Sequence, residues 1–270
     1  MLGRKAIVVE VAADMLAEPA GGAERVSQAL LGETVTVVGQ SAGWAQVRTP
    51  DGYPGWVRAE ALVPAPPNGY PPQGRGALVR PMLAHVRSGP VDSAPPVTLV
   101  ALGALLWAEP GTHGWRRVRL PRGETGWTRS RDLAPPLALR SVPPDGRELV
   151  AAAYRFLGVP YLWGGRSPLG IDCSGLTQSA YGLCGVVIPR DAHLQAEWEG
   201  FSEVALGGLR AGDLLFFSGD EDPLQRGITH VGMALDGERM IHAPGGRGVC
   251  VEPFDAPPYA SRLVAARGLR

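Results

Sequence analysis

An internal repeat is the feature of this 270-residue chain that most limits its fold. One glycine and two tryptophans occur twice, with steps of twelve residues in each copy: Gly32, Trp44 and Trp56, then Gly103, Trp115 and Trp127. Around them, segments such as LLGETVTVV and ALGALLWA alternate apolar and polar residues between glycine turns, as short strands do. Repeated short strands of this kind predict two small antiparallel β-barrels, one for each copy.

Two proline-rich stretches, PAPPNGYPPQGRG and PPLALRSVPPDG, can continue neither a helix nor a sheet. They predict a division of the chain into a first barrel, a linker, a second barrel, a second linker and a third domain: residues 1–64, 65–76, 77–135, 136–146 and 147–270. Both barrels carry a glycine-led strand, then GW-x-x-V, then GW and a terminal leucine. This order resembles that of bacterial SH3 domains, although packing in a barrel core also explains the tryptophans.

The third domain is predicted to contain helices first and then an antiparallel sheet, which is an α+β fold. Residues 147–157 (RELVAAAYRFL) carry apolar residues at helical spacing, and residues 172–184 (DCSGLTQSAYGLC) begin with helix-capping Asp and Ser and stop at Gly185. Three β-rich segments follow, GDLLFFSG, ITHVGMAL and RMIHAP. The last two are joined through Asp236-Gly237, a hairpin signal.

Cys173 stands at the start of the second predicted helix, which suits a nucleophile. The positive end of the helix dipole favours a thiolate there and so contributes to a lowered thiol pKa. Cys184 lies at the far end of the same helix and Cys250 in a predicted strand, so both are interpreted as small hydrophobic residues.

His230 and His242 supply a base for this thiol. They are an even number of residues apart and straddle Asp236, so a regular hairpin places them on one sheet face, with Cβ atoms about 5 Å apart as cross-strand neighbours. One histidine can then orient the other, which predicts a Cys173/His230/His242 triad. A zinc site is the competing use of these residue types, but short-spaced ligand pairs are absent from the sequence, so no metal is predicted.

Composition excludes two classes of partner. The chain has 26 basic and 26 acidic residues and no run of Lys or Arg, so we expect neither nucleic acid nor a membrane as partner. No segment reaches the roughly 18 apolar residues of a membrane span, and Glu10 and Asp14 interrupt the stretch that a signal peptide needs. Three widely spaced cysteines argue against a disulfide framework. We therefore predict a cytoplasmic protein, and we expect a monomer.

Five segments of the third domain carry a family resemblance: PYLWGGRSPLGIDCSGLTQSAY, IPRDA, GDLLFF, HVGMAL and IHAP. They resemble the NlpC-type cysteine peptidases of papain-like fold. Within that group the chain is most similar to γ-D-glutamyl-L-diamino acid endopeptidases with leading SH3 domains. The resemblance implies hydrolysis of the bond between γ-D-glutamate and the diamino acid in small peptidoglycan-derived peptides, with no cofactor.

The same resemblance implies roles for the residues of the site. Cys173 would attack the γ-glutamyl carbonyl, His230 would move the proton, and His242 would hold His230 in the useful tautomer. The backbone N–H of Cys173 and the Tyr161 hydroxyl would stabilise the oxyanion, although Tyr161 equally suits core packing. Trp163 is expected to shape or wall the substrate cleft.

Substrate specificity is expected from the neighbours of the cysteine. Asp172 could pair with a substrate ammonium and Ser174 could donate to a carboxylate of the γ-glutamyl residue, although both also suit helix capping. Arg190 resembles a family arginine near the substrate carboxylate, or it is a surface residue. Many relatives have Ser or Thr where this chain has Ala192, which leaves the carboxylate contacts open.

The first barrel is expected to close the site. By the resemblance, Glu18 and Tyr53 would surround a free N-terminal L-alanine amine. The second repeat has Glu124 in place of Tyr53, so a tyrosine is not a general requirement of the barrel. This predicts an enzyme that trims small peptides in murein recycling. The alternative from another class is a cell-wall-binding SH3 protein with a secondary or silent catalytic domain.

Overall fold

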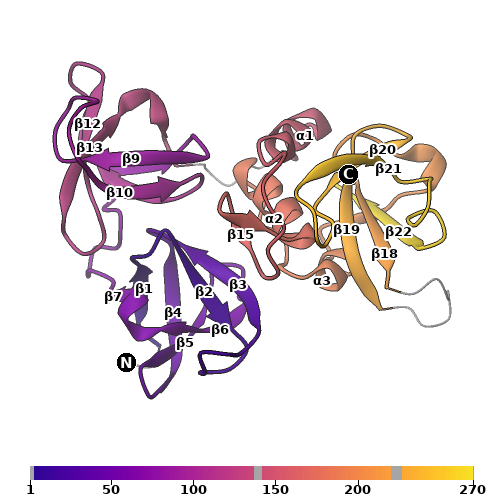
Figure 1. The fold of residues 1–270 in the computed structure, drawn as a ribbon, viewed down its shortest axis with the longest axis horizontal. Coiled ribbons are helices and arrows are strands. Elements are labelled where there is room, and N and C mark those ends of the chain that lie inside the picture. Colours follow the sequence, from indigo (N-terminus) through magenta and orange to yellow (C-terminus); the bar gives the residue numbers. More distant parts are fainter. Residues whose placement is uncertain (1–2, 137–141, 220–226, 270) are drawn as a thin grey trace. The chain divides into compact units, whose positions relative to one another are not determined.

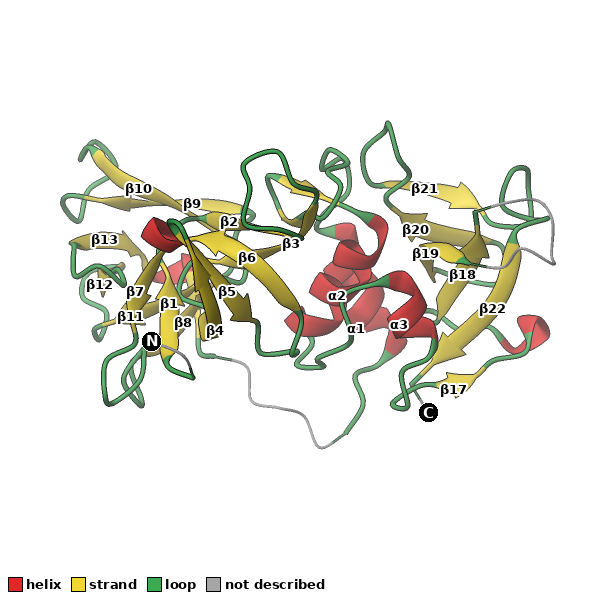
Figure 2. Ribbon diagram, turned by 90° about the horizontal axis from the view of Figure 1, so that it is seen from below, coloured by secondary structure: helices red, strands yellow, loops and turns green. Residues whose placement is uncertain are grey.

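A computed structural model describes residues 3–136, 142–219 and 227–269 (Figure 1). The chain forms two compact units, residues 1–137 and residues 138–270. The first unit is built of strands with two short 3-10 helices, Ala59–Ala61 and Ser130–Asp132, and the second of helices and strands, as predicted (Figure 2). No helix in the described ranges is long and apolar enough to cross a membrane.

The first unit contains the two predicted barrels. The strands of the first are β1 (Lys5–Val8), β2 (Ala12–Leu16), β3 (Arg25–Leu30), β4 (Thr34–Ser41), β5 (Trp44–Arg48), β6 (Pro54–Arg58) and β7 (Leu62–Pro64). Those of the second are β8 (Gly76–Val79), β9 (Leu83–Arg87), β10 (Pro96–Ala101), β11 (Leu105–Ala108), β12 (Trp115–Arg119), β13 (Thr125–Arg129) and β14 (Leu133–Ala134). Within the described residues the sheet orders, β3-β2-β6-β5-β4-β1-β7 and β10-β9-β13-β12-β11-β8-β14, are equivalent strand by strand. The repeat in the sequence is therefore a repeat of topology.

The tryptophans that mark the repeat pack in equivalent ways. Trp44 and Trp115 are buried, and the guanidinium of Arg58 or Arg129 lies 4.2 or 4.3 Å from the respective ring centroid. Such a contact stabilises both partners. Gly32 has φ of +83°, and an added Cβ would lie 1.8 Å from a backbone oxygen of the second barrel, so this turn requires glycine.

The domain boundaries remain predictions, although the strands fit them. The first barrel's last strand ends at Pro64, and the second barrel's strands run from Gly76 to Ala134. Between the barrels, the Tyr70 hydroxyl donates to the Arg119 carbonyl oxygen at 2.9 Å, which ties the linker to the second barrel. The predicted linker over 136–146 lies partly outside the described residues.

The second unit has the α+β architecture expected from its sequence. Its helices are α1 (Gly146–Tyr154), α2 (Cys173–Leu183) and α3 (Ala192–Ala196), and a small hairpin pairs β15 (Arg166–Ser167) with β16 (Gly170–Ile171). The antiparallel sheet has the order β17-β22-β18-β19-β20-β21, with bounds Ser202–Glu203, Leu263–Gly268, Leu214–Ser218, Ile228–Ala234, Arg239–His242 and Cys250–Pro253. All three helices pack against β19, which therefore lies at the centre of the domain (Figures 1 and 2).

Both predicted helix starts agree with the structure, because an aspartate caps each one. Asp145 accepts a hydrogen bond from the Arg147 backbone N–H, and Asp172 accepts one from the Gly175 backbone N–H at 2.7 Å. Side-chain caps of this kind satisfy the free N–H groups of the first turn. Cys173 is consequently the first residue of α2, at the positive end of its dipole.

Candidate active site

The Cys173 side chain is buried between α2 and the central strand β19. Cys173 is 8% exposed, and the backbone N–H of Val231 lies within hydrogen-bonding reach of its sulfur. Val231 follows His230 directly on β19. The packing of α2 on β19 therefore brings the predicted nucleophile to the strand that carries the predicted base.

His230 and His242 contact each other, but the predicted pairing register is wrong. His242 lies opposite Gly232, not opposite His230, because the turn has three residues, 236–238, and is centred on Gly237. The Asp236 carboxylate stabilises this turn by accepting from the backbone N–H of Arg239 at 2.7 Å. The two histidines are thus diagonal neighbours on one sheet face, and His230 Nε2 lies 2.9 Å from His242 Nδ1.

Gly232 makes room for this arrangement. A Cβ at this position would lie 2.6 Å from the Met240 sulfur and 3.3 Å from the Cβ of His242. A side chain there would displace the Met240 side chain and crowd His242, since protein cores are close-packed. Glycine at this position therefore lets β19 pack closely against β20.

The histidine chain continues to Glu252 on β21. His242, which is completely buried, has its Nε2 3.0 Å from Glu252 Oε2. Arg247 donates to Glu252 Oε1 at 2.6 Å. The Tyr259 ring lies against both imidazoles, at 6.0 Å from the His230 centroid and 5.0 Å from that of His242.

Sequence reasoning missed Glu252, Arg247 and Tyr259. Glu252 reaches His242 only because β21 pairs with β20, and a loop of seven residues, 243–249, separates the two strands. A loop of that length leaves the pairing register of β21 open. A single sequence therefore cannot show which residue of β21 faces His242.

Within the described residues, one group of side chains on β20 and β21 has the composition of a metal site. His242, Cys250 and Glu252 offer ligand atoms that all lie within 4.8 Å of one another. A metal would need Nε2 of His242 without its proton, whereas that nitrogen already faces the Glu252 carboxylate. The Arg247 guanidinium also places a positive charge beside the same carboxylate. The hydrogen bonds therefore account for the cluster.

One buried hydrogen-bond network adjoins the nucleophile and consists of Asp172, Ser174 and Arg190. Arg190, which is 2% exposed, donates to both carboxylate oxygens of Asp172, at 3.0 and 2.7 Å, and to the Ser174 hydroxyl at 2.9 Å. Asp172 also accepts from the backbone N–H of Gly164 at 2.9 Å. Arg190 is therefore a buried residue, so the surface interpretation of it was wrong. The network holds the loop over residues 162–165 against the start of α2.

Tyr161 directly precedes that loop, and Trp163 lies in it. Burial, with the negative charges of Cys173 and Asp172, raises the pKa of the half-buried Tyr161 hydroxyl to about 12. This hydroxyl therefore keeps its proton at neutral pH and can donate it to an oxyanion. Trp163 is 58% exposed, and its place in the wall of the substrate cleft remains a prediction.

Electrostatics keep both the thiol and the imidazole uncharged. Burial raises the pKa of the Cys173 thiol to about 11, and Asp172 raises it further, so burial outweighs the helix dipole from which we expected a lowered value. Burial likewise lowers the pKa of His230 to about 3, and the neighbouring His242 adds to this. A neutral imidazole can act as the general base of a neutral thiol during attack.

This arrangement predicts how fast iodoacetamide alkylates Cys173 at each pH. Because only the thiolate reacts, the rate should rise with an apparent pKa well above the usual 8.5 or so of a free thiol. The measurement is peptide mass spectrometry of the free enzyme from about pH 4 to 11, with a small thiol such as glutathione alkylated in parallel as the reference. Rapid alkylation that already levels off near pH 5 would instead show a thiolate–imidazolium pair and contradict the neutral resting state.

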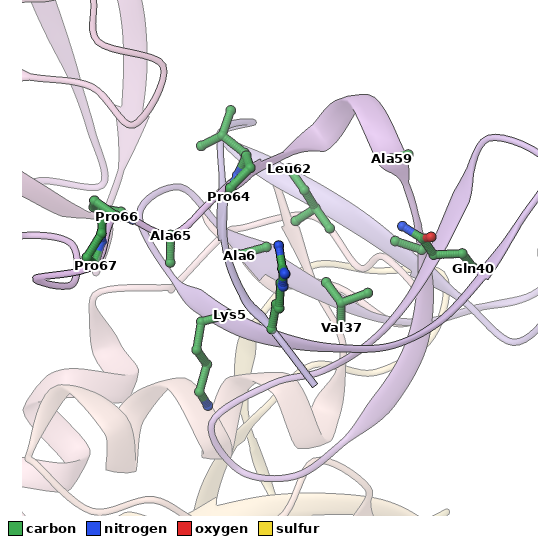
Figure 3. A pocket seen from close by; sticks show the side chains of 13 residues that line it. Lys5, Ala6, Val37, Gln40, Ala59, Leu62, Pro64, Ala65, Pro66 and Pro67 are labelled. Carbon is green, nitrogen blue, oxygen red and sulfur yellow. The ribbon is translucent and has the colours of Figure 1, made fainter. Parts of the chain in front are cut away.

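Two pockets bear on binding. One, of about 270 Å³, lies beside His230 and is also lined by Phe217, Thr229 and Tyr259. The other, of about 420 Å³, lies in the first barrel, where alanine, valine, leucine and proline side chains line most of it (Figure 3). Among the described residues that line this second pocket, none is a predicted site residue. The pocket at His230 is therefore the one that adjoins the predicted chemistry.

Glu18 and Tyr53 lie on the first barrel. Glu18 is exposed in the turn after β2, and Tyr53 precedes β6 and packs partly against the barrel core. The Thr49 backbone N–H donates to the Tyr53 carbonyl oxygen, as Leu120 does to Glu124 in the second barrel. The backbones of the two repeats therefore agree here while the side chains differ. Their contact with substrate remains a prediction.

Comparisons with known proteins agree with this geometry. Residues 158–268 match the NlpC/P60 family, and residues 15–62 match the bacterial dipeptidyl-peptidase Sh3 domain. The chain is 32% identical over 253 residues to the gamma-D-glutamyl-L-lysine dipeptidyl-peptidase of Bacillus cereus (strain ATCC 10987 / NRS 248), covering 89% of this chain and 74% of that protein. It is 33% identical over 261 residues to dipeptidyl-peptidase 6 of Lysinibacillus sphaericus, covering 93% and 92%.

A solved structure extends the similarity to the fold. The crystal structure of an NlpC/P60 family protein from Bacillus cereus ATCC 10987 matches with a TM-score of 0.86 and 26% identity, covering 98% of this chain and 99% of that one. The chain therefore belongs to the NlpC/P60 family, as a cysteine peptidase that follows N-terminal bacterial SH3 domains. It is related to gamma-D-glutamyl-L-lysine dipeptidyl-peptidases.

Proposed function

We propose that this peptidase hydrolyses the γ-D-glutamyl-L-diamino acid bond of small peptidoglycan-derived peptides that have a free N-terminal L-alanine. One observation carries the proposal: the similarity to the Bacillus cereus dipeptidyl-peptidase extends over 89% of the chain, so it includes the barrels as well as the catalytic domain. The match of the first barrel to a dipeptidyl-peptidase Sh3 domain supports it independently.

In the proposed mechanism, Cys173 Sγ attacks the γ-glutamyl carbonyl carbon while His230 takes the thiol proton. The backbone N–H of Cys173 and the Tyr161 hydroxyl stabilise the oxyanion of the tetrahedral intermediate. His230 then returns the proton to the amine of the departing diamino acid, which leaves a thioester on Cys173. Water, deprotonated by His230, hydrolyses the thioester and restores the thiol.

In the proposed specificity, some polar side chains hold the site in shape and others bind the substrate. Arg190 neutralises the buried Asp172 carboxylate, so Asp172 contributes to the amine site mainly through the loop that it holds. The exposed Glu18 carboxylate, together with Tyr53, is then the proposed partner of the substrate's ammonium group. Stem peptides in intact wall have that nitrogen blocked, which favours a role in recycling small peptides within the cell.

Amine recognition has a direct test. Wild-type enzyme should hydrolyse L-Ala-γ-D-Glu-L-Lys, and N-acetylation of the alanine should lower kcat/KM by about 100-fold or more, because the bound peptide would cover the Glu18 carboxylate, which is exposed in the free enzyme, without offering it a charged donor. Glu18→Gln should reduce this discrimination at least tenfold by raising KM for the free amine. Glu124→Gln, at the position equivalent to Tyr53 in the second barrel, is the matched control and should change nothing. Equal cleavage of free and acetylated peptide would refute amine recognition.

The alternative, a wall-binding protein with a silent catalytic domain, has less support. A silent domain would be expected to lack part of the catalytic set, whereas Cys173 lies beside β19 and His230 contacts His242 at 2.9 Å. The intact set favours an enzyme.

A further inference from the structure

We propose that Glu252 is a positioning residue of the active site, whose carboxylate fixes the tautomer of His242 and, through it, that of His230. The inference deepens the proposed function, because it rests on His230 as the base of Cys173. It adds a fourth member to the predicted set of Cys173, His230 and His242.

The hydrogen-bond chain determines where each proton lies. An ionised carboxylate can only accept, so the 3.0 Å contact between Glu252 Oε2 and His242 Nε2 requires a proton on that nitrogen. A neutral His242 then has a bare Nδ1, which accepts from His230 Nε2 at 2.9 Å. The proton of a neutral His230 is thereby held on Nε2. Its Nδ1 is left bare, and this is the nitrogen that can take the thiol proton.

Glu252 meets the two conditions for this role, because it is ionised and it is held in place. Burial acts to raise its carboxyl pKa, but the Arg247 hydrogen bond and the charges of His242 and Arg247 outweigh burial and lower the pKa. Arg247 holds Oε1 at 2.6 Å, and the Tyr259 hydroxyl hydrogen-bonds the same carboxylate. The carboxylate that orients His242 is thus itself held by Arg247, from the loop before β21, and by Tyr259.

Loss of the carboxylate would allow the opposite tautomer. His242 could then carry its proton on Nδ1 and donate it to His230 Nε2, which would move the His230 proton to Nδ1. That nitrogen could no longer accept the thiol proton, so the base would be lost in that fraction of molecules. The effect falls on kcat, because the substrate touches neither Glu252 nor His242 in the proposed mechanism.

Glutamine is an informative replacement because it has one acceptor oxygen where the carboxylate has two. In wild type, Arg247 donates to Oε1 and His242 to Oε2. Glu252→Gln must therefore turn its amide N–H₂ towards one of these two donors, whereas the Tyr259 hydroxyl can adapt because it can either donate or accept. If Arg247 is also replaced, in Arg247→Met/Glu252→Gln, the glutamine oxygen can turn freely to His242. The second substitution should then recover activity.

The kinetic test uses the full-length protein and the tripeptide L-Ala-γ-D-Glu-L-Lys. Glu252→Gln should lower kcat by about 10- to 100-fold with KM within about twofold, as is typical when the partner that orients a histidine is removed. The double variant should regain at least about fivefold of this loss. Glu238→Gln removes the same charge from an exposed residue of the neighbouring hairpin turn and should keep wild-type kcat. An unchanged kcat in Glu252→Gln would overturn the proposal.

A spectroscopic measurement separates this proposal from the proposed function. Nitrogen-15 NMR of the wild-type histidine rings at neutral pH should show His242 protonated at Nε2 and bare at Nδ1, with the Nδ1-protonated form appearing in Glu252→Gln. This readout needs no substrate, so it remains decisive if the tripeptide is not cleaved and the proposed function fails. A wild-type spectrum with the His242 proton on Nδ1 would overturn the positioning role.

Discussion

Replacing Cys173 by alanine is expected to abolish peptide hydrolysis, with a fall in kcat on the order of 10⁶-fold. Removal of the nucleophile from a triad costs about this much, because no other group can form the covalent intermediate. Cys173 is the buried first residue of α2 and its sulfur lies beside Val231 on β19. The fold should be retained, since alanine is a good helix former and fits the site.

Cys184→Ala is the matched control for this prediction. Cys184 is also a buried cysteine, but it lies at the C-cap of the same helix. Its replacement should leave kcat within about twofold of wild type. Hydrolysis is measured by mass spectrometry of the released dipeptide, with far-ultraviolet circular dichroism of each variant. A Cys173→Ala enzyme with wild-type fold and more than about 1% of wild-type kcat would contradict covalent catalysis by this thiol.

The second large effect concerns stability: Arg190→Met should lower the free energy of unfolding of the catalytic domain by about 3 to 5 kcal/mol. The substitution removes one partner of a buried ion pair and leaves the Asp172 carboxylate uncompensated. The side chains of Arg190 and Asp172 are 1% and 9% exposed. Because the same carboxylate caps α2 and holds Gly164, the loss extends to the start of the helix that carries the nucleophile.

The protein contains a control pair with similar geometry and different exposure. Arg239 and Asp236 also form a two-pronged ion pair, with a closest distance of 2.7 Å, but their side chains are 58% and 40% exposed. Arg239→Met should therefore cost at most about 1 kcal/mol. For both variants, the unfolding of the catalytic domain is measured as the loss of activity with increasing urea concentration. Equal, small costs for both would show that the Arg190–Asp172 pair does not stabilise the domain.

The parts of the fold that depend on local signals were predictable from the sequence. The repeat gave the two barrels, and the Asp172 cap placed Cys173 at the first position of α2. The even spacing of His230 and His242 placed both rings on one sheet face. In each case the physical cause lies within a few residues of the element that it determines.

The parts that depend on tertiary packing were not predictable. The hairpin register was wrong because the turn is centred on Gly237 and not on Asp236, and the Asp236 carboxylate holds this turn by accepting from the Arg239 backbone N–H. The thiol pKa moved in the opposite direction because the extent of burial cannot be read from a helix-capping pattern. Glu252 was missed because its strand reaches His242 only through the pairing of β20 with β21.

The most direct test of the account is the identity of the bond that the enzyme cleaves. We would incubate wild-type enzyme with L-Ala-γ-D-Glu-L-Lys, with its diaminopimelate analogue, and with the isomer in which glutamate is linked through its α-carboxyl, and identify the products by mass spectrometry. The account predicts release of L-Ala-D-Glu and the free diamino acid from the γ-linked peptides only. Cleavage between alanine and glutamate, or equal cleavage of the α-linked isomer, would contradict it.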